Sequence, residues 1–261
     1  MRFDVITLFP ELFAPFLAAG VTRRAYEGKL VDVRLWNLRD HAEGNYRRVD
    51  DRPFGGGPGM VMMAAPLLKC LEAIRADRGT STGSARTEGS APVVLFSPIG
   101  QRLDHAAVER WSASEGAILV CGRYEGIDQR FIDKHVDLQI SLGDFVLSGG
   151  EIAAMALLDA VARLQPGVLN DEGSHAADSF NPALDGLLDC PHYTRPEEWA
   201  GVGVPPELMS GHHAQIERWR REQRLALTAR ERPDLIEAAR AAGRLTKADL
   251  AFLARPPEKR L

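Results

Sequence analysis

Several features that would assign this chain to a familiar class are scarce or missing. It has three cysteines, Cys70, Cys121 and Cys190, an odd number without a Cys-x-x-Cys pair, so neither a disulfide framework nor a zinc ribbon is expected. No uninterrupted apolar stretch reaches the length of a membrane span. The sequence therefore favours a protein of the reducing cytoplasm that makes no membrane contact.

Two nucleotide-binding motifs are also missing. No glycine-rich segment continues into Gly-Lys-Ser or Gly-Lys-Thr, and no Gly-x-Gly-x-x-Gly spacing occurs. A kinase would need the first as a phosphate cradle, and a nicotinamide dehydrogenase would need the second. Both enzyme classes are therefore disfavoured.

The chain has enough hydrophobic residues to form a core, and its charge is unevenly distributed along the sequence. The 261 residues are 45% hydrophobic, enough for one large domain or a core with a smaller module. The net charge is −4, but residues 211–261 hold 12 Lys and Arg against 7 Asp and Glu, which leaves −9 for residues 1–210. A basic C-terminal module on an acidic body favours a polyanionic partner.

The order of apolar segments predicts an α/β fold. Strands are expected at residues 3–8, 31–36, 93–96, 117–121 and 138–142, with helices at 65–78, 104–112, 127–135 and 149–164. Strands that alternate with helices are typical of a parallel sheet covered by helices. Residues 79–91 are of low complexity and expected to be mobile. Residues 168–204 show no period, and helices are expected again at 214–230, 233–242 and 247–254.

Three turns follow three of the expected strands and carry Gly, Pro and polar residues, at 95–100, 121–128 and 141–151. The third contains Gly143, Gly149 and Gly150, which leave bare backbone against which a flat ligand can lie. The carboxyl ends of parallel strands are where open α/β folds place ligands. The sequence therefore predicts one ligand crevice, although glycine-rich turns often only reverse the chain.

Two further segments have a functional and a plain interpretation. Residues 37–59 form a long polar connection that ends in a run of glycine and proline, either a surface that a base or phosphate approaches or a hinge. Arg218, Arg221 and Arg224 repeat at a spacing of three, as on one helical stripe. Such a stripe is either a solvated face or a contact with a polyanion.

Taken together, these motifs resemble the bacterial tRNA (guanine-N1)-methyltransferases of the SPOUT class, the TrmD family. The resemblance runs through nearly the whole chain and is carried by residues 7–11, 51–60, 121–130, 143–151, 159–164, 166–169, 178–180, 186–196 and 208–213. Several of these stretches are too long and unusual for a chance match.

The resemblance implies a domain organisation. Residues 1–167 would form a parallel-sheet SPOUT domain with a deep trefoil knot, which is a rare exception to the rules of chain topology. Residues 168–210 would be an interdomain linker and active-site loop, and residues 211–261 a small all-helical domain that binds tRNA. The active site would lie at the interface of a homodimer.

The resemblance also implies site residues. S-adenosylmethionine would be bound by Leu95, Phe96, Ser97, Pro98, Gly122, Tyr124, Glu125, Leu142, Gly143, Phe145, Leu147, Gly149 and Gly150. The tRNA substrate would be contacted by Gly55, Gly57, Gly59, Met60, Arg218 and Arg221.

The implied reaction is methyl transfer to N1 of the guanine at position 37 of tRNA, 3′ of the anticodon. That nitrogen carries a proton, so a positioned general base is needed. By resemblance the base is Asp178, contributed by the partner subunit, and Arg163 stabilises the charge that develops on O6. The family implies Mg²⁺ as well, at a site the sequence does not reveal, with Glu125 near the cofactor or the metal.

Two departures from the family pattern and two alternatives remain. Phe145 stands where the family commonly has Tyr, and the segment between Phe180 and Gly186 is longer than expected. A related SPOUT methyltransferase that acts on another RNA site would share the cofactor turns. A non-catalytic RNA-binding module would keep the glycine loops and the basic C-terminus but would not need Asp178 and Arg163.

Overall fold

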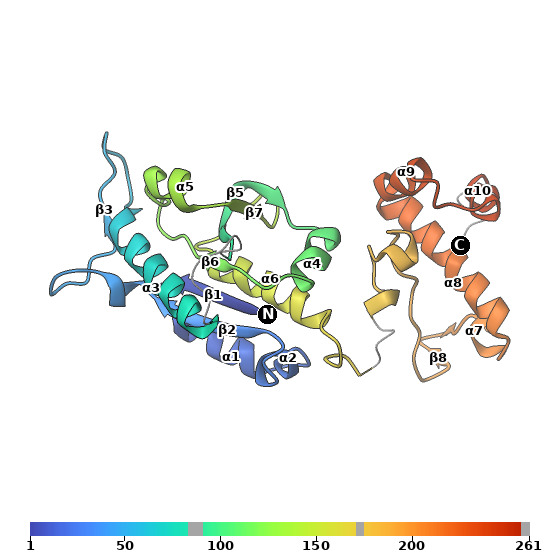
Figure 1. Ribbon diagram of the computed structural model, residues 1–261. Helices are drawn as coiled ribbons and strands as arrows, with labels where there is room; N and C mark the ends of the chain where they lie inside the picture. Colours follow the sequence, from blue (N-terminus) through green and yellow to red (C-terminus); the bar gives the residue numbers. More distant parts are fainter. Residues whose placement is uncertain (83–90, 171–174, 257–261) are drawn as a thin grey trace. The chain divides into compact units, whose positions relative to one another are not determined.

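The computed structural model describes residues 1–82, 91–170 and 175–256. The chain divides into two compact units, Met1–Leu169 and Asn170–Leu261 (Figure 1). Of the low-complexity stretch expected to be mobile, residues 83–90 lie outside the described residues. Residues 79–82 instead continue the helix before them, α3 (Ala64–Thr82).

The first unit is built on a five-stranded parallel sheet, which confirms the predicted α/β fold with a parallel sheet. Its strands are β1 (Arg2–Thr7), β2 (Asp32–Asn37), β5 (Val93–Arg102), β6 (Ile118–Val120) and β7 (Leu138–Ser141). They lie in the order β2-β1-β6-β5-β7, and every adjacent pair is parallel. The carboxyl ends of β6, β5 and β7 therefore meet at one edge of the sheet.

Helices cover both faces of this sheet. One face packs against α1 (Phe13–Ala18), α2 (Arg23–Glu27), α4 (His105–Ser112) and α6 (Glu151–Arg163). The other packs against α3, α5 (Gln129–His135) and the short helix η2 (Leu38–His41). The unit also contains the short helix η1 (Pro10–Leu12) and a small antiparallel pair, β3 (Asp50–Asp51) with β4 (Val61–Met62).

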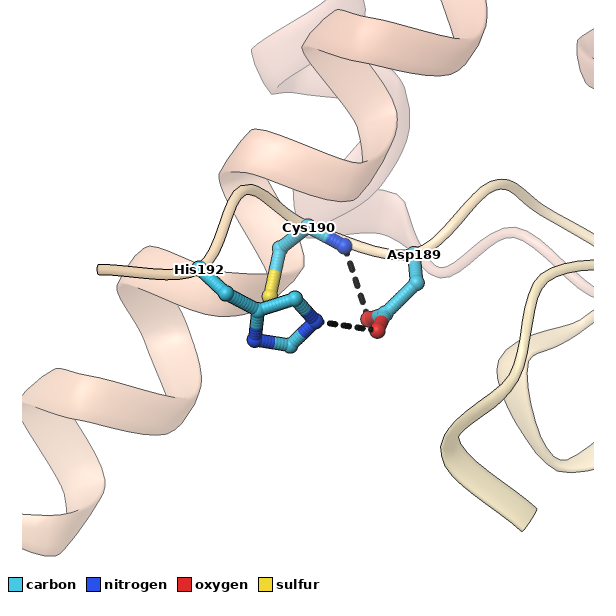
Figure 2. Close-up of side chains that lie close together, drawn as sticks. All are labelled: Asp189, Cys190 and His192. Carbon is cyan, nitrogen blue, oxygen red and sulfur yellow. Dashed lines mark hydrogen bonds and ion pairs between the residues drawn. The ribbon is translucent and has the colours of Figure 1, made fainter. Parts of the chain in front are cut away.

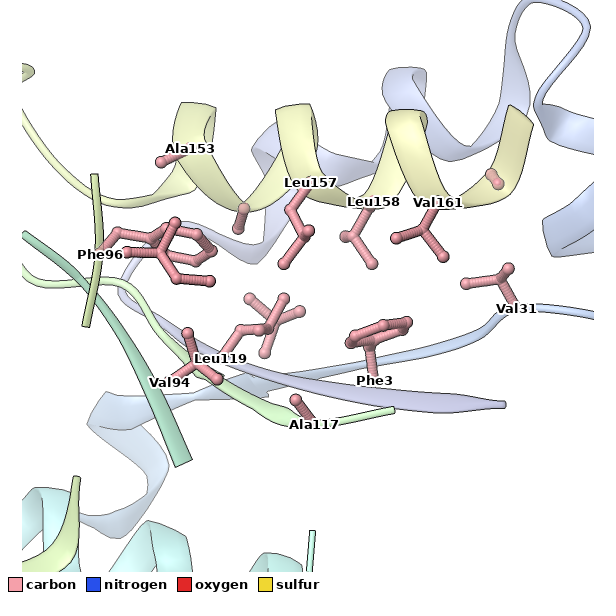
Figure 3. Packing of buried hydrophobic residues seen from close by; sticks show 14 of the residues in the cluster. Phe3, Val31, Val94, Phe96, Ala117, Leu119, Ala153, Leu157, Leu158 and Val161 are labelled. Carbon is pink, nitrogen blue, oxygen red and sulfur yellow. The ribbon is translucent and has the colours of Figure 1, made fainter. Parts of the chain in front are cut away.

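Alternation along the strands explains why two cores form. In β5, Val94 and Phe96 point to the α6 face, whereas Val93 and Leu95 point to the α3 face. Successive side chains of a strand point to opposite faces, so a continuous apolar run buries both sides. Figure 3 shows the first core, where Leu157, Leu158 and Val161 of α6 face the strands.

The structure differs from the sequence prediction at the end of β5. This strand was expected to stop at Phe96, but it continues to Arg102. Its pairing with β7 is interrupted between Phe96 and Gln101. Residues 97–100 thus bulge out of the strand, because Gly100 and Pro98 break a regular ladder, and pairing then resumes.

The second unit has its own apolar core beneath three helices, α8 (His213–Glu231), α9 (Pro233–Ala241) and α10 (Lys247–Leu253). Its other elements are η3 (His175–Ala177), η4 (Pro182–Leu184), β8 (Glu198–Trp199), β9 (Val202–Gly203) and α7 (Pro206–Met209). Leu187 is fully buried in that core. Part of the segment expected to be a linker therefore contributes to the packing of the helical unit.

Across residues 1–82, 91–170 and 175–256, none of the helices is both long and apolar enough to cross a bilayer.

All three cysteines are buried and free. Burial raises the pKa of Cys70 to about 12 and raises the pKa of Cys121 and Cys190 as well. A thiol with a raised pKa holds little reactive thiolate at pH 8.

We therefore expect Ellman's reagent at pH 8 to react with the native protein at least about tenfold more slowly than with the protein unfolded in guanidinium, where all three thiols react. A native thiol that reacts as fast as in the unfolded control would contradict the burial of that cysteine.

Candidate functional site

A single pocket of about 260 Å³ lies where the three glycine-containing turns meet. All thirteen residues predicted to bind the cofactor line it. They come from the bulge in β5, from the turn after β6 and from the turn between β7 and α6. The structure thus brings together three segments that are far apart in the sequence.

Backbone contacts hold the second and third turns against each other. The Gly150 amide donates to the Gly122 carbonyl at 3.0 Å. A Cβ at Gly150 would lie 2.7 Å from the Cα of Cys121, closer than side-chain carbons approach backbone. Only glycine fits at residue 150, because the two backbones are in contact there.

The predicted substrate loop is attached to the same turn. β4 follows this loop, and the Met60 carbonyl accepts from the Glu125 amide at 3.0 Å, while the Met62 amide donates to the Gly126 carbonyl at 2.9 Å. A Cβ at Gly59 would lie 2.4 Å from Cγ of Glu125, and Gly59 has a φ of +80°. Gly59 and Met60 therefore lie directly beside the pocket residue Glu125.

Tyr124 makes a second link between this loop and the pocket. Its backbone is left-handed, with a φ of 61°. Its hydroxyl interacts with Asp50 and Arg39, and burial together with the charge of Asp50 raises the pKa of Tyr124.

The tip of the predicted substrate loop is open to solvent. Gly55 and Gly57 have positive φ angles of 85° and 120°, and the space beside each is empty. The neighbouring Phe54 side chain is fully exposed. The structure thus provides the bare backbone that the sequence predicted, next to an aromatic ring that sequence reasoning did not single out.

The two predicted catalytic residues belong to different units. Arg163 is the last residue of α6 and is half-buried, where its cation is favourable for the helix dipole. Asp178 is half-buried directly after η3.

The segment around Asp178 is folded by its own hydrogen bonds. The Asn181 side chain donates to the His175 carbonyl at 3.0 Å, and the Phe180 amide donates to the Leu187 carbonyl at 2.9 Å. The additional residues between Phe180 and Gly186 form η4 and a left-handed turn at Asp185, which has a φ of 59°. The longer segment is thus accommodated as one compact turn.

The two arginines predicted to contact tRNA have different surroundings. Arg218 is 73% exposed and pairs with Glu222 of its own helix, at 3.1 Å. Arg221 binds Asp249 at 2.9 Å and Asp185 at 2.8 Å. Although burial opposes its ionisation, the hydrogen bond from Arg221 helps to hold the pKa of Asp249 below its usual range.

Asp189, Cys190 and His192 are the one group of three potential metal ligands within the described part of the chain (Figure 2). The Asp189 carboxylate accepts from His192 at 2.9 Å and from Arg224 at 3.3 Å. The guanidinium of Arg224 already supplies the positive charge beside the Asp189 carboxylate. A thiol and an imidazole also do not suit Mg²⁺, which prefers oxygen ligands. The geometry indicates an ion-paired turn.

Sequence reasoning missed Arg123, which lines the pocket between Gly122 and Tyr124. Its guanidinium lies 2.9 Å from the carboxylate of Glu151. The available signal was its place inside the second glycine turn, but an arginine in a turn is usually solvated, and only the tertiary fold buries it.

A pocket at the carboxyl ends of neighbouring parallel strands, formed by bare turns, is typical of α/β enzymes that bind a nucleoside-like cofactor. The sequence comparisons define the class. The chain belongs to the family described as tRNA (guanine-1)-methyltransferase TrmD, whose family model matches residues 1–238. The resemblance stated from the motifs is thereby confirmed.

Individual relatives agree with the family. The chain is 76% identical over 255 residues to a tRNA (guanine-N(1)-)-methyltransferase of Paracidovorax citrulli, with 98% of each chain covered. It is 77% identical over 254 residues to that of Polaromonas sp., covering 97% of this chain and 96% of the relative. It is also 59% identical over 254 residues to that of Bordetella pertussis, with 97% of each covered.

The backbone contact at Gly150 can be tested by a substitution that adds a single methyl group there. We expect Gly150→Ala to lower the free energy of unfolding by about 1–3 kcal/mol, because its Cβ forces two backbones apart. The measurement is urea denaturation followed by circular dichroism. The matched control is Gly79→Ala, in α3 of the same unit, where nothing lies within 4 Å of the added carbon. Equal stability of both variants would contradict the contact.

Proposed function

We propose that the protein transfers a methyl group from S-adenosylmethionine to N1 of the guanine at position 37 of tRNA. The observation that carries this proposal is the meeting of all thirteen predicted cofactor residues around one pocket, beside the loop that ends in Gly59 and Met60. Membership in the tRNA (guanine-1)-methyltransferase family supports the substrate and the reaction.

The pocket suits the cofactor in shape and chemistry. Leu95, Leu142 and Leu147 offer apolar sides for an adenine ring, and the glycine turns offer amides and carbonyls for its polar edges. The absence of Cβ atoms at Gly122 and Gly150 keeps the backbone accessible. When bound, S-adenosylmethionine supplies an electrophilic methyl group on a sulfonium.

The chain's own residues would prepare the acceptor. We assign Asp178, from the partner subunit, to accept the proton of guanine N1, since the nitrogen lone pair becomes nucleophilic only when that proton leaves. We assign Arg163 to the negative charge that spreads to O6, because a planar guanidinium donates two parallel hydrogen bonds. The half-buried setting of each side chain supports a role beyond solvation.

Mg²⁺ is expected from the family resemblance. Glu125 is the only carboxylate among the described residues that line the pocket. A single carboxylate with waters and substrate oxygens is a common way for proteins to hold Mg²⁺. We propose Glu125 as the residue that binds Mg²⁺, and we propose no step of the reaction for the ion.

The finer architecture belongs to this proposal. We propose the trefoil knot from membership in the family. The homodimer is supported by apolar side chains at the pocket rim, where Phe145 is 56% and Val146 is 84% exposed. Exposed apolar groups beside a pocket are typical of an interface.

We propose that residues 211–261 bind the tRNA backbone and that residues 168–210 carry the active-site loop. The net charge of +5 in the last 51 residues supports the first assignment. Arg218, exposed on α8, is the proposed phosphate contact. Arg221, which two carboxylates neutralise, is instead proposed to hold that helix in its unit.

The proposed function is tested by transfer of a labelled methyl group from S-adenosylmethionine to unmodified tRNA transcripts with and without Mg²⁺. One transcript carries guanine 3′ of the anticodon, and the matched control carries adenine there. We expect label only in the guanine transcript. Cofactor binding without transfer to either would move the assignment to another RNA site, and transfer to both would refute recognition of guanine N1.

The role of Asp178 predicts a selective loss. Asp178→Asn keeps the size of the side chain but removes the base, so single-turnover methyl transfer should fall by at least about a hundredfold. Binding of S-adenosylmethionine, measured by calorimetry, should change by less than about twofold, since Asp178 is assigned to the acceptor guanine and not to the cofactor. The matched control is Glu115→Gln, an exposed carboxylate of the first unit. An active Asp178→Asn protein would remove Asp178 from the reaction.

Substitutions of Arg218 and Arg221 in α8 are expected to have different effects. Arg218→Gln should weaken tRNA binding and reduce the slope of log K against log salt by about 1, with stability unchanged. Arg221→Gln should lower stability by about 1–3 kcal/mol, because Asp249 and Asp185 lose their cation. Filter binding at several salt concentrations and urea denaturation measure the two effects. The reverse pattern would exchange the two roles.

A further inference from the structure

A buried carboxylate lies directly behind the pocket wall. Glu151, the first residue of α6, is 1% exposed. One of its oxygens accepts from the Thr7 hydroxyl at 2.8 Å, and the other lies 2.9 Å from the Arg123 guanidinium. Thr7 ends β1 and is fully buried. This side chain thus joins the end of a central strand to the turn that follows β6.

Arg123 extends the connection to the third turn. Its guanidinium donates to the Ser148 carbonyl at 3.2 Å. It also lies over the ring of Phe9, 4.6 Å from the ring centroid. Arg123 and Ser148 both line the pocket, whereas Glu151 does not. The Glu151 side chain therefore lies behind the pocket wall and is paired with Arg123, a residue of that wall.

Arg123 packs closely against the backbone of the third turn. A Cβ at Gly149 would lie 2.2 Å from Nε of Arg123 and 2.6 Å from a Glu151 oxygen. Gly149 also pairs with Arg123 in an isolated antiparallel bridge. The third turn is closed over the ion pair, so the position of the arginine and the position of the turn are set together.

A carboxylate in an apolar core is costly unless it is paired and hydrogen-bonded. One Glu151 oxygen accepts the hydrogen bond from Thr7, and the other is ion-paired with Arg123 but accepts no hydrogen bond within the described residues. The positive end of α6 also favours the charge. Replacing such a pair with apolar residues is often neutral for stability. Stability alone therefore does not account for this arrangement behind a binding pocket.

We propose that Glu151 is a positioning residue for the cofactor pocket: it orients Arg123 and, through Arg123, aligns residues 122–126 with residues 147–150. The inference rests on the proposed function, since it concerns the pocket assigned to S-adenosylmethionine. Glu151 is proposed to raise the affinity of this pocket for S-adenosylmethionine.

The experiment uses three variants of the full-length chain. Glu151→Gln keeps the shape but removes the charge that holds Arg123. Glu151→Gln with Arg123→Gln removes both charges, so no buried ion lacks a partner. The matched control is Asp4→Asn in β1, which removes another fully buried carboxylate, paired with Arg2 and Arg78. The dissociation constant for S-adenosylmethionine is measured by calorimetry, and melting temperature is measured separately.

At a temperature where each variant is folded, Glu151→Gln and the double variant should bind S-adenosylmethionine about tenfold more weakly, as when an outer partner of a binding residue is lost. Asp4→Asn should melt earlier but bind within about twofold of the parent. The double variant should melt at a higher temperature than Glu151→Gln, but its affinity for S-adenosylmethionine should stay as low. If Glu151→Gln does not fold, the comparison of the double variant with Asp4→Asn decides.

Affinity within about twofold of the parent in the folded Glu151 variants would overturn the assignment and leave only a structural ion pair. An equal loss of affinity in Asp4→Asn would overturn it as well, because affinity would then follow stability. A parent chain that binds no S-adenosylmethionine would overturn the proposed function, and the assignment with it.

Discussion

The pocket depends on direct contact between the backbones of its second and third turns. Gly150 lies against Cys121 so closely that one methyl group would collide, and its amide bonds to the Gly122 carbonyl. The second turn follows β6 and the third follows β7, and both strands pair with β5 between them, so the sheet sets the separation of the two turns within narrow limits. Arg123 of the second turn is also ion-paired with Glu151, the residue that follows Gly150. The shape of the pocket is therefore a property of the packed sheet rather than of any one loop.

The same turns connect the pocket to the loop that precedes β4. Met60 and Met62 exchange backbone hydrogen bonds with Glu125 and Gly126, while the space beside Gly55, Gly56 and Gly57 is empty. The base of this loop is consequently held to the pocket wall, and its tip is open to solvent. An enzyme that transfers a group between two bound molecules needs this combination, since both must be held in one geometry.

Much of the first unit followed from its apolar runs. Val93–Phe96 and residues 117–121 were recognisable as buried strands, and the helix expected at 104–112 is present as α4. The bulge in β5 was not recognisable, because it depends on how a neighbouring strand pairs. The sequence also placed Arg218 and Arg221 on one stripe. Their different surroundings arise from Asp185 and Asp249, which are distant in the chain.

Local chemistry alone determined the glycine-rich turns, the order of strands and helices and the motifs of the family, because each depends on residues that are adjacent along the chain. Tertiary structure decided that three turns form one pocket, that Gly59 lies against Glu125 and that Thr7 meets Glu151 across 144 positions of sequence. No period or motif encodes such contacts. They arise when parallel strands bring their carboxyl ends to one edge, and a buried charge such as Glu151 is then satisfied only by the partners that the sheet places beside it.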